Sequence, residues 1–162
     1  HPELGFEEFA TSDLVAEQLQ GWGYTVRRGL GGTGVVAQLK VGDGTQRLGL
    51  RADMDALPIH ESTGLPYRST IPGKMHACGH DGHTAMLLAA AKHLARERRF
   101  SGTLNLIFQP AEEGLGGAFA MIADGVLEKP RPDLALALHL WNHIPYGQVR
   151  VTDGPAMASS RA

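Results

Sequence analysis

Short β-prone segments alternate with amphipathic helical segments along this chain, and the alternation limits its fold more than any other feature. The pattern of apolar residues and glycine-rich turns predicts strands at 24–28, 35–41, 47–52, 103–108 and 133–140. It predicts helices at 11–21, 84–98 and 117–124. Because strands that alternate with helices usually form a parallel or mixed sheet, we expect an α/β fold with a largely parallel or mixed sheet.

The composition excludes several classes of protein. The 162 residues are 43% hydrophobic and 20% charged, which is typical of one globular domain. The net charge is −2 and the only basic cluster is Arg96, Arg98 and Arg99, so we expect no nucleic-acid partner. The apolar runs are too short to span a bilayer, and we expect no membrane partner. A single cysteine, Cys78, forbids an internal disulfide and favours the cytoplasm.

The segment 75–83 concentrates groups that bind metal ions. The chain has eight histidines, and three of them, His76, His80 and His83, surround Cys78. A thiolate and an imidazole two residues apart in a glycine-containing loop can point at one ion, and both are ligands of Zn²⁺ or similar ions. The alternative is an inert buried cysteine beside a helix-capping loop. We favour the metal site.

Two adjacent carboxylates, Glu112 and Glu113, follow the predicted strand 103–108 and precede the next helix. Adjacent side chains in a loop point in different directions, so one carboxylate can bind metal while the other faces a reacting water. Taken alone, such a pair is more commonly a solvated helix N-terminus.

The polar groups share one position relative to the predicted sheet. Most of them follow the C-terminal end of a strand, which is where ligands bind in open α/β sheets. In isolation, a histidine in an apolar run, such as His139, is more often a hydrogen-bonded core residue. The shared position instead suggests convergence of four ligands: Cys78, His80, Glu113 and His139. Three carboxylates are candidates to orient the imidazoles: Asp53, Asp55 and Asp81.

Taken together, the motifs resemble those of the metal-dependent amidohydrolases typified by hippurate hydrolase, N-acyl-amino-acid amidohydrolases and plant auxin-conjugate hydrolases. The segments that carry the resemblance are 1–8, 50–58, 75–83, 108–114 and 139–141. The resemblance covers nearly the whole chain. It implies a three-layer, zinc-peptidase-like catalytic domain with helices on both faces of the sheet, here incomplete.

The resemblance also implies an activity and its residues. Two divalent ions (Zn, Mn, Co or Ni) would be bound by Cys78, His80, Glu113 and His139, and Glu112 would be the general base. The reaction would hydrolyse the amide bond of an N-acyl amino acid, a hippurate-like substrate, to a carboxylic acid and an amino acid. The full-length protein would be a homo-oligomer.

The family pattern includes parts that this chain lacks, a fifth histidine ligand and an inserted dimerisation domain. We therefore expect residues 1–152 to be the N-terminal part of the catalytic domain, and 153–162 to be a linker toward the dimerisation domain. We expect this fragment alone to be inactive.

Two other functions fit parts of the sequence. One is a non-catalytic, truncated metal-binding relative. The missing fifth histidine favours it for this chain, whereas the presence of Glu112 favours the enzyme, because a site that only binds metal does not need a general base. The other is a magnesium phosphotransfer site at Asp53 and Asp55, which leaves the Cys-His cluster unexplained and lacks a phosphate-binding loop.

Overall fold

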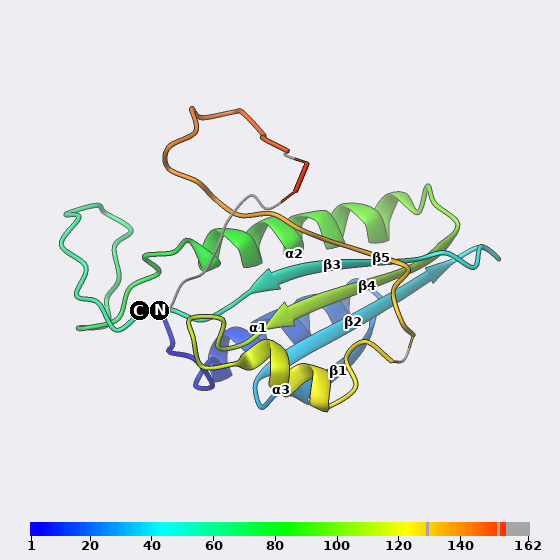
Figure 1. The fold of residues 1–162 in the computed structure, drawn as a ribbon, viewed down its shortest axis with the longest axis horizontal. Coiled ribbons are helices and arrows are strands. Elements are labelled where there is room, and N and C mark those ends of the chain that lie inside the picture. The colour runs from blue at the N-terminus through cyan, green and yellow to red at the C-terminus, as the bar shows by residue number, and fades with distance from the viewer. Residues whose placement is uncertain (129, 152, 155–162) are drawn as a thin grey trace.

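The computed structural model describes residues 1–128, 130–151 and 153–154. In this part of the chain, the elements in order are α1 (Phe9–Gly21), β1 (Thr25–Leu30), β2 (Gly34–Val41), β3 (Arg47–Asp53), α2 (His80–Glu97), β4 (Gly102–Gln109), α3 (Gly117–Ala123) and β5 (Leu134–Ala137). The strands form one sheet in the order β1-β2-β4-β3-β5 (Figure 1). β2 pairs antiparallel with β1 and β4, whereas β3 pairs parallel with β4 and β5. The expected mixed α/β sheet is confirmed.

Helices lie on both faces of the sheet, and the alternating direction of side chains along β4 shows why. Leu106 and Phe108 point to a core shared with α1 and α2, which includes Val15, Leu19 and Ala91. Ile107 points the other way, into a smaller cluster that includes Met121 of α3. Because successive strand residues face opposite sides, one apolar strand can serve two cores, and the three-layer arrangement follows.

The edge strand β5 differs from its prediction. It ends at Ala137 rather than at residue 140, and all four of its residues are exposed. Leu134, Leu136 and Leu138 are 58%, 52% and 63% exposed. An apolar pattern predicts a strand, but it cannot reveal whether another layer covers that strand. No other element of the described chain does.

Both long helices begin earlier than predicted. α1 begins at Phe9, where the Glu3 carboxylate accepts hydrogen bonds from the backbone N–H groups of Ala10 and Thr11. α2 begins at His80, directly after Gly79, whose φ of 84° is a conformation that glycine adopts easily. His80 and His83 are therefore three residues apart on the first turn of α2, on the same side of the helix.

Two sequence predictions remain, a C-terminal linker and the absence of a membrane-spanning segment. Of the predicted linker 153–162, only residues 153 and 154 lie within the described part of the chain. Throughout the described residues, none of the helices has the length and apolar character needed to cross a membrane.

Candidate metal centre

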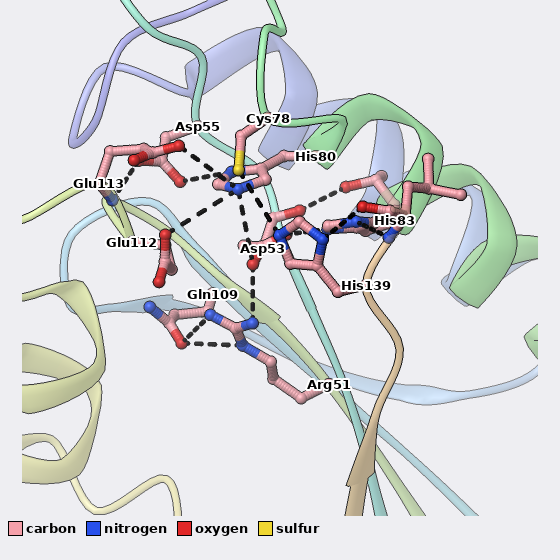
Figure 2. Close-up of polar contacts among 12 residues, drawn as sticks. Arg51, Asp53, Asp55, Cys78, His80, His83, Gln109, Glu112, Glu113 and His139 are labelled. Carbon is pink, nitrogen blue, oxygen red and sulfur yellow. Dashed lines mark hydrogen bonds and ion pairs between the residues drawn. The ribbon is translucent and has the colours of Figure 1, made fainter. Parts of the chain in front are cut away.

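The candidate site lies at one edge of the sheet, beyond the carboxyl ends of β3, β4 and β5. These three strands run in the same direction, so their carboxyl ends meet at this edge. β3 ends at Asp53, Glu112 and Glu113 follow β4, and His139 follows β5. The first turn of α2 adds His80 and, just before it, Cys78 (Figure 2). The site therefore combines segments far apart in the sequence.

His80 occupies the centre of the site, and its two ring nitrogens have different surroundings. Its Nδ1 lies 3.2 Å from Asp55 Oδ1, which fits an N–H donated to the carboxylate. Its Nε2 is buried and, among the described residues, has no hydrogen-bond partner. This Nε2 atom lies 3.7 Å from Glu113 Oε1 and 3.9 Å from Glu112 Oε2. Asp53 Oδ2 lies 3.8 Å from the same atom, so the imidazole presents a free nitrogen to three carboxylates.

Cys78 and His139 form the other side of the site. The Cys78 Sγ lies 3.5 Å from His139 Nε2, and His139 Nδ1 donates to the backbone oxygen of Leu140 at 2.6 Å. The Leu140 oxygen can only accept, so Nδ1 carries the proton and Nε2 presents a lone pair toward the thiol. Burial and the neighbouring Glu113 carboxylate raise the pKa of Cys78 to about 12.

Asp55 ties two of these groups together. One carboxylate oxygen contacts His80, and the other accepts the backbone N–H of Glu113 at 3.0 Å. Burial works against the charged form of Asp55, but the hydrogen bonds from His80 and from the Glu113 backbone outweigh it, so its pKa is lowered. Burial likewise disfavours protonated His80, but Asp55 and the other carboxylates raise the pKa of this histidine.

Asp53 orients a histidine that received no role in the sequence analysis. Its Oδ1 lies 2.6 Å from His83 Nδ1, and its Oδ2 accepts a hydrogen bond from Arg51 at 2.7 Å. Arg51 also donates to the Gln109 side chain at the end of β4. Despite its burial, Asp53 keeps a pKa lowered to about 2, because His83 and Arg51 favour its charged form. The three-residue spacing of His80 and His83 was the signal that could have found this pair.

The third predicted carboxylate is placed differently. Asp81 is exposed, and its side chain accepts a hydrogen bond from the backbone of Gly82. The structure therefore does not bring Asp81 to the imidazoles as it brings Asp53 and Asp55. It also weakens the magnesium phosphotransfer alternative, because the carboxylates of Asp53 and Asp55 are buried and already hold His83 and His80.

The donor atoms fit a divalent metal ion. Ligand atoms of Cys78, His80 and His139 lie within 4.8 Å of one another, as do those of His80, Glu112 and Glu113. The structure buries Glu113 Oε1 as well as His80 Nε2, with no hydrogen-bond partner among the described residues for either. Buried polar atoms are normally satisfied, so two such atoms 3.7 Å apart fit a cation as their shared partner. Mixed sulfur, nitrogen and oxygen donors suit Zn²⁺ and its neighbours.

Comparisons with known proteins show the family to which the chain belongs. A family described as Peptidase family M20/M25/M40 matches residues 49–155, a stretch that contains the whole candidate site. The chain belongs to this family. The M20 family match confirms the expected relationship to metal-dependent amidohydrolases and peptidases.

Individual relatives in the M20 family are similar along almost the entire chain. Hippurate hydrolase of Campylobacter jejuni is 53% identical over 163 residues, covering 99% of this chain and 42% of that protein. An IAA-amino acid hydrolase of Arabidopsis thaliana is 46% identical over 161 residues, covering 99% of this chain and 36% of that protein. The chain thus spans only about two fifths of the length of these relatives.

A solved structure supports the fold assignment. A dinuclear metal-binding peptidase of the M20 family from Bacillus subtilis superimposes with a TM-score of 0.89 at 38% identity, covering 96% of this chain and 43% of that chain. The M20 family fold is therefore shown for this chain.

Proposed function

We propose that the protein hydrolyses the amide bond of N-acyl amino acids in a metal-dependent reaction that releases a carboxylic acid and an amino acid. The observation that carries this proposal is the buried Nε2 atom of His80, which lacks a hydrogen-bond partner among the described residues and faces Glu112 and Glu113. The names of the relatives, hippurate hydrolase and IAA-amino acid hydrolase, support this substrate class.

The ligands that we propose for two divalent ions (Zn, Mn, Co or Ni) are Cys78, His80, Glu113 and His139. When bound, such ions polarise a substrate carbonyl and lower the pKa of water. Asp55 holds His80 so that Nε2 points into the site, and it holds the Glu113 backbone from the same carboxylate. The Leu140 oxygen fixes the tautomer of His139.

Glu112 is the general base in this proposal. Its side chain is 42% exposed, compared with 26% for Glu113, so it is the more accessible of the two adjacent carboxylates. A carboxylate beside the ligands but open to substrate can take a proton from water while the oxygen of that water bonds to the carbonyl carbon. It can then deliver that proton to the amide nitrogen as the carbon–nitrogen bond breaks.

The substrate would bind in an open cleft next to the thiol. This cleft has a volume of about 450 Å³ and is lined by residues that include Cys78, His139, Leu140 and Trp141. The mixture of polar ligands and apolar side chains suits an acyl group attached to a polar amide.

Glu112→Gln in the full-length protein tests the proposal. Because Gln cannot accept the proton, turnover of hippurate should fall at least about 100-fold, with metal content unchanged. Glu113→Gln should lower metal content measured by elemental analysis, and the exposed Glu128→Gln is the matched control for loss of one charge. Near-normal turnover by Glu112→Gln would remove it from the mechanism.

The organisation of the full-length protein is also a proposal. We propose that residues 1–152 form the N-terminal part of the catalytic domain; the chain covers 42% of the length of hippurate hydrolase. A homo-oligomeric assembly and a cytoplasmic location are predictions that oligomer measurements and fractionation would test.

A further inference from the structure

The N-terminal segment, residues 3–8, touches both loops that bear the acidic residues of the site. The backbone N–H of Ala56, next to Asp55, donates to the backbone carbonyl oxygen of Glu3 at 2.8 Å. At the other end of the segment, the Glu8 side chain accepts the backbone N–H of Ala111, next to Glu112, also at 2.8 Å. The segment thus lies against the backbone on either side of the proposed metal site.

Glu8 is an unusual residue to find in this position. It is 0% exposed, although burying a carboxyl group costs free energy unless its oxygens are hydrogen-bonded. Both oxygens have partners, because Thr33 Oγ1 donates to Oε2 at 2.5 Å and Ala111 donates to Oε1. Glu8 precedes α1, yet its side chain does not cap that helix, a task performed by Glu3. Its carboxyl group is therefore directed at the turn after β4.

That turn has a backbone conformation that needs support. Ala111 has a φ of 50°, a value that residues other than glycine adopt rarely, and it is fully buried. Gly117 packs so closely that an added Cβ would lie 1.8 Å from the Pro110 oxygen. The Gly117 N–H donates to the Ala111 oxygen at 3.0 Å, and Glu8 accepts the Ala111 N–H. Both polar groups of the Ala111 backbone are thereby held.

We propose that Glu8 is a positioning residue that fixes the turn from which Glu112 and Glu113 project. It touches neither carboxylate directly and acts through the Ala111 backbone. Loss of its acceptor oxygen would free the Ala111 N–H and let the turn relax from its positive φ, which would move Glu112 and Glu113 away from His80. This inference rests on the proposed function, which assigns Glu112 and Glu113 their roles.

Three variants of the full-length protein separate the acceptor role from simple destabilisation. Glu8→Met keeps the length of the side chain but removes both acceptor oxygens. Glu8→Gln keeps one acceptor for the Ala111 N–H, while its amide N–H can donate to Thr33 Oγ1. Thr33→Val removes the other hydrogen bond of the same carboxyl group and leaves the Ala111 contact in place, so it is the matched control.

The readouts are Co²⁺ affinity, the visible spectrum of bound Co²⁺, and kcat and KM for hippurate. For Glu8→Met we expect at least about 10-fold weaker Co²⁺ binding, an altered spectrum, and a kcat that falls at least about 10-fold while KM changes less. Glu8→Gln and Thr33→Val should stay within about 3-fold of the unmodified protein, as their Ala111 contact is kept. A folded Glu8→Met with unchanged Co²⁺ affinity and spectrum overturns the proposal, as does a loss in Glu8→Gln equal to that in Glu8→Met.

If Glu8→Met does not fold, Glu8→Asp decides the question. Its carboxyl group is one methylene shorter and is drawn back from the Ala111 N–H as well as from Thr33. Weaker Co²⁺ binding than in Thr33→Val supports the proposal, and a Co²⁺ affinity and spectrum equal to those of Thr33→Val overturn it. The Co²⁺ measurements also keep the two proposals separate. An unmodified protein that binds Co²⁺ without hydrolysing hippurate contradicts the proposed function, and the Co²⁺ comparison between variants still tests Glu8.

Discussion

His83 accepts a hydrogen bond at Nε2 from the backbone N–H of Leu140, at 2.9 Å. Its other nitrogen, Nδ1, lies 2.6 Å from Asp53 Oδ1 and must carry the ring proton, because Nε2 is the acceptor. Leu140 directly follows His139. The contacts of His83 with Asp53 and Leu140 therefore hold the backbone that follows β5. They thereby hold His139 opposite Cys78.

Replacing His83 with Leu should weaken metal binding, although His83 is not a proposed ligand. The substitution leaves the Leu140 N–H without its acceptor and Asp53 without one of its donors, so His139 loses its fixed position. We expect about 10- to 100-fold weaker binding of Zn²⁺ in competition with a chelator. His93→Leu, at an exposed position of α2, is the control. Equal Zn²⁺ affinity in both variants would contradict this role.

Metal binding should become tighter as the pH rises. Without a cation, the pKa of Cys78 is about 12, raised by burial and by the neighbouring carboxylates, so the thiol is protonated at neutral pH. Binding as a thiolate must release this proton, which adds up to about 10-fold in apparent affinity for each pH unit.

Cys78→Ala provides the comparison for this pH dependence. Zn²⁺ affinity measured by competition from pH 6 to 8 should be lower in the variant and should rise less steeply with pH. His80 also titrates, and its contribution is common to both proteins. The same affinity and slope in the two proteins would rule out Cys78 as a thiolate ligand.

The hydroxyl of Tyr24 should make the fold sensitive to alkali. Burial raises the pKa of Tyr24 to about 12, and its hydroxyl donates to the Ala91 oxygen at 2.9 Å. The folded pKa is above the unfolded value near 10, so the stabilisation is complete below about pH 10 and is lost as the pH rises toward 12. The change is at most about 3 kcal/mol.

Urea unfolding of the unmodified protein and Tyr24→Phe at several pH values measures this change. At pH 9 the variant should be less stable by about 1 kcal/mol, the value of one hydrogen bond. The difference should shrink and reverse toward pH 12, because Phe does not ionise. A difference that is constant with pH would refute the assignment.

Residues 1–162 alone should bind divalent metal but hydrolyse little or no hippurate. The family resemblance implies a fifth histidine ligand in addition to the four proposed here, and with four ligands alone one ion would be bound loosely. Leu134 and Leu136 of β5 and the following Leu138 are exposed, and we expect the isolated chain to self-associate, which light scattering would detect. A monodisperse chain with turnover on the order of 10 per second would contradict this prediction.

The sequence was sufficient to predict most of the elements and the location of the site. The apolar run in residues 103–108 follows directly from burial of the strand on two faces, and β4 extends this prediction by only one residue at each end. The edge location of the candidate site followed from the order of strands and polar clusters, and parallel pairing of β3, β4 and β5 explains why these residues lie together.

Other features depend on contacts between distant segments and leave no local pattern. The sequence gives no sign that Glu8 reaches Ala111, 103 residues away, or that the backbone of Leu140 binds His83. The start of α2 at His80 depends on the left-handed conformation of Gly79. In the sequence alone, the residues just before the predicted start at 84 suit a loop as well as a helix. Such features arise from tertiary packing, which local propensity does not determine.

The pairing of Asp53 with His83 and of Asp55 with His80 joins the end of β3 to one turn of α2. The carboxylates are two residues apart on an extended chain and the imidazoles three apart on a helix, spans of roughly 7 Å and 5 Å. One added residue between Asp53 and Asp55 would turn one carboxylate to the opposite side of the chain. An insertion or deletion within this short framework would therefore break at least one of the two pairs, whereas a substitution outside it leaves the spacing of both pairs unchanged.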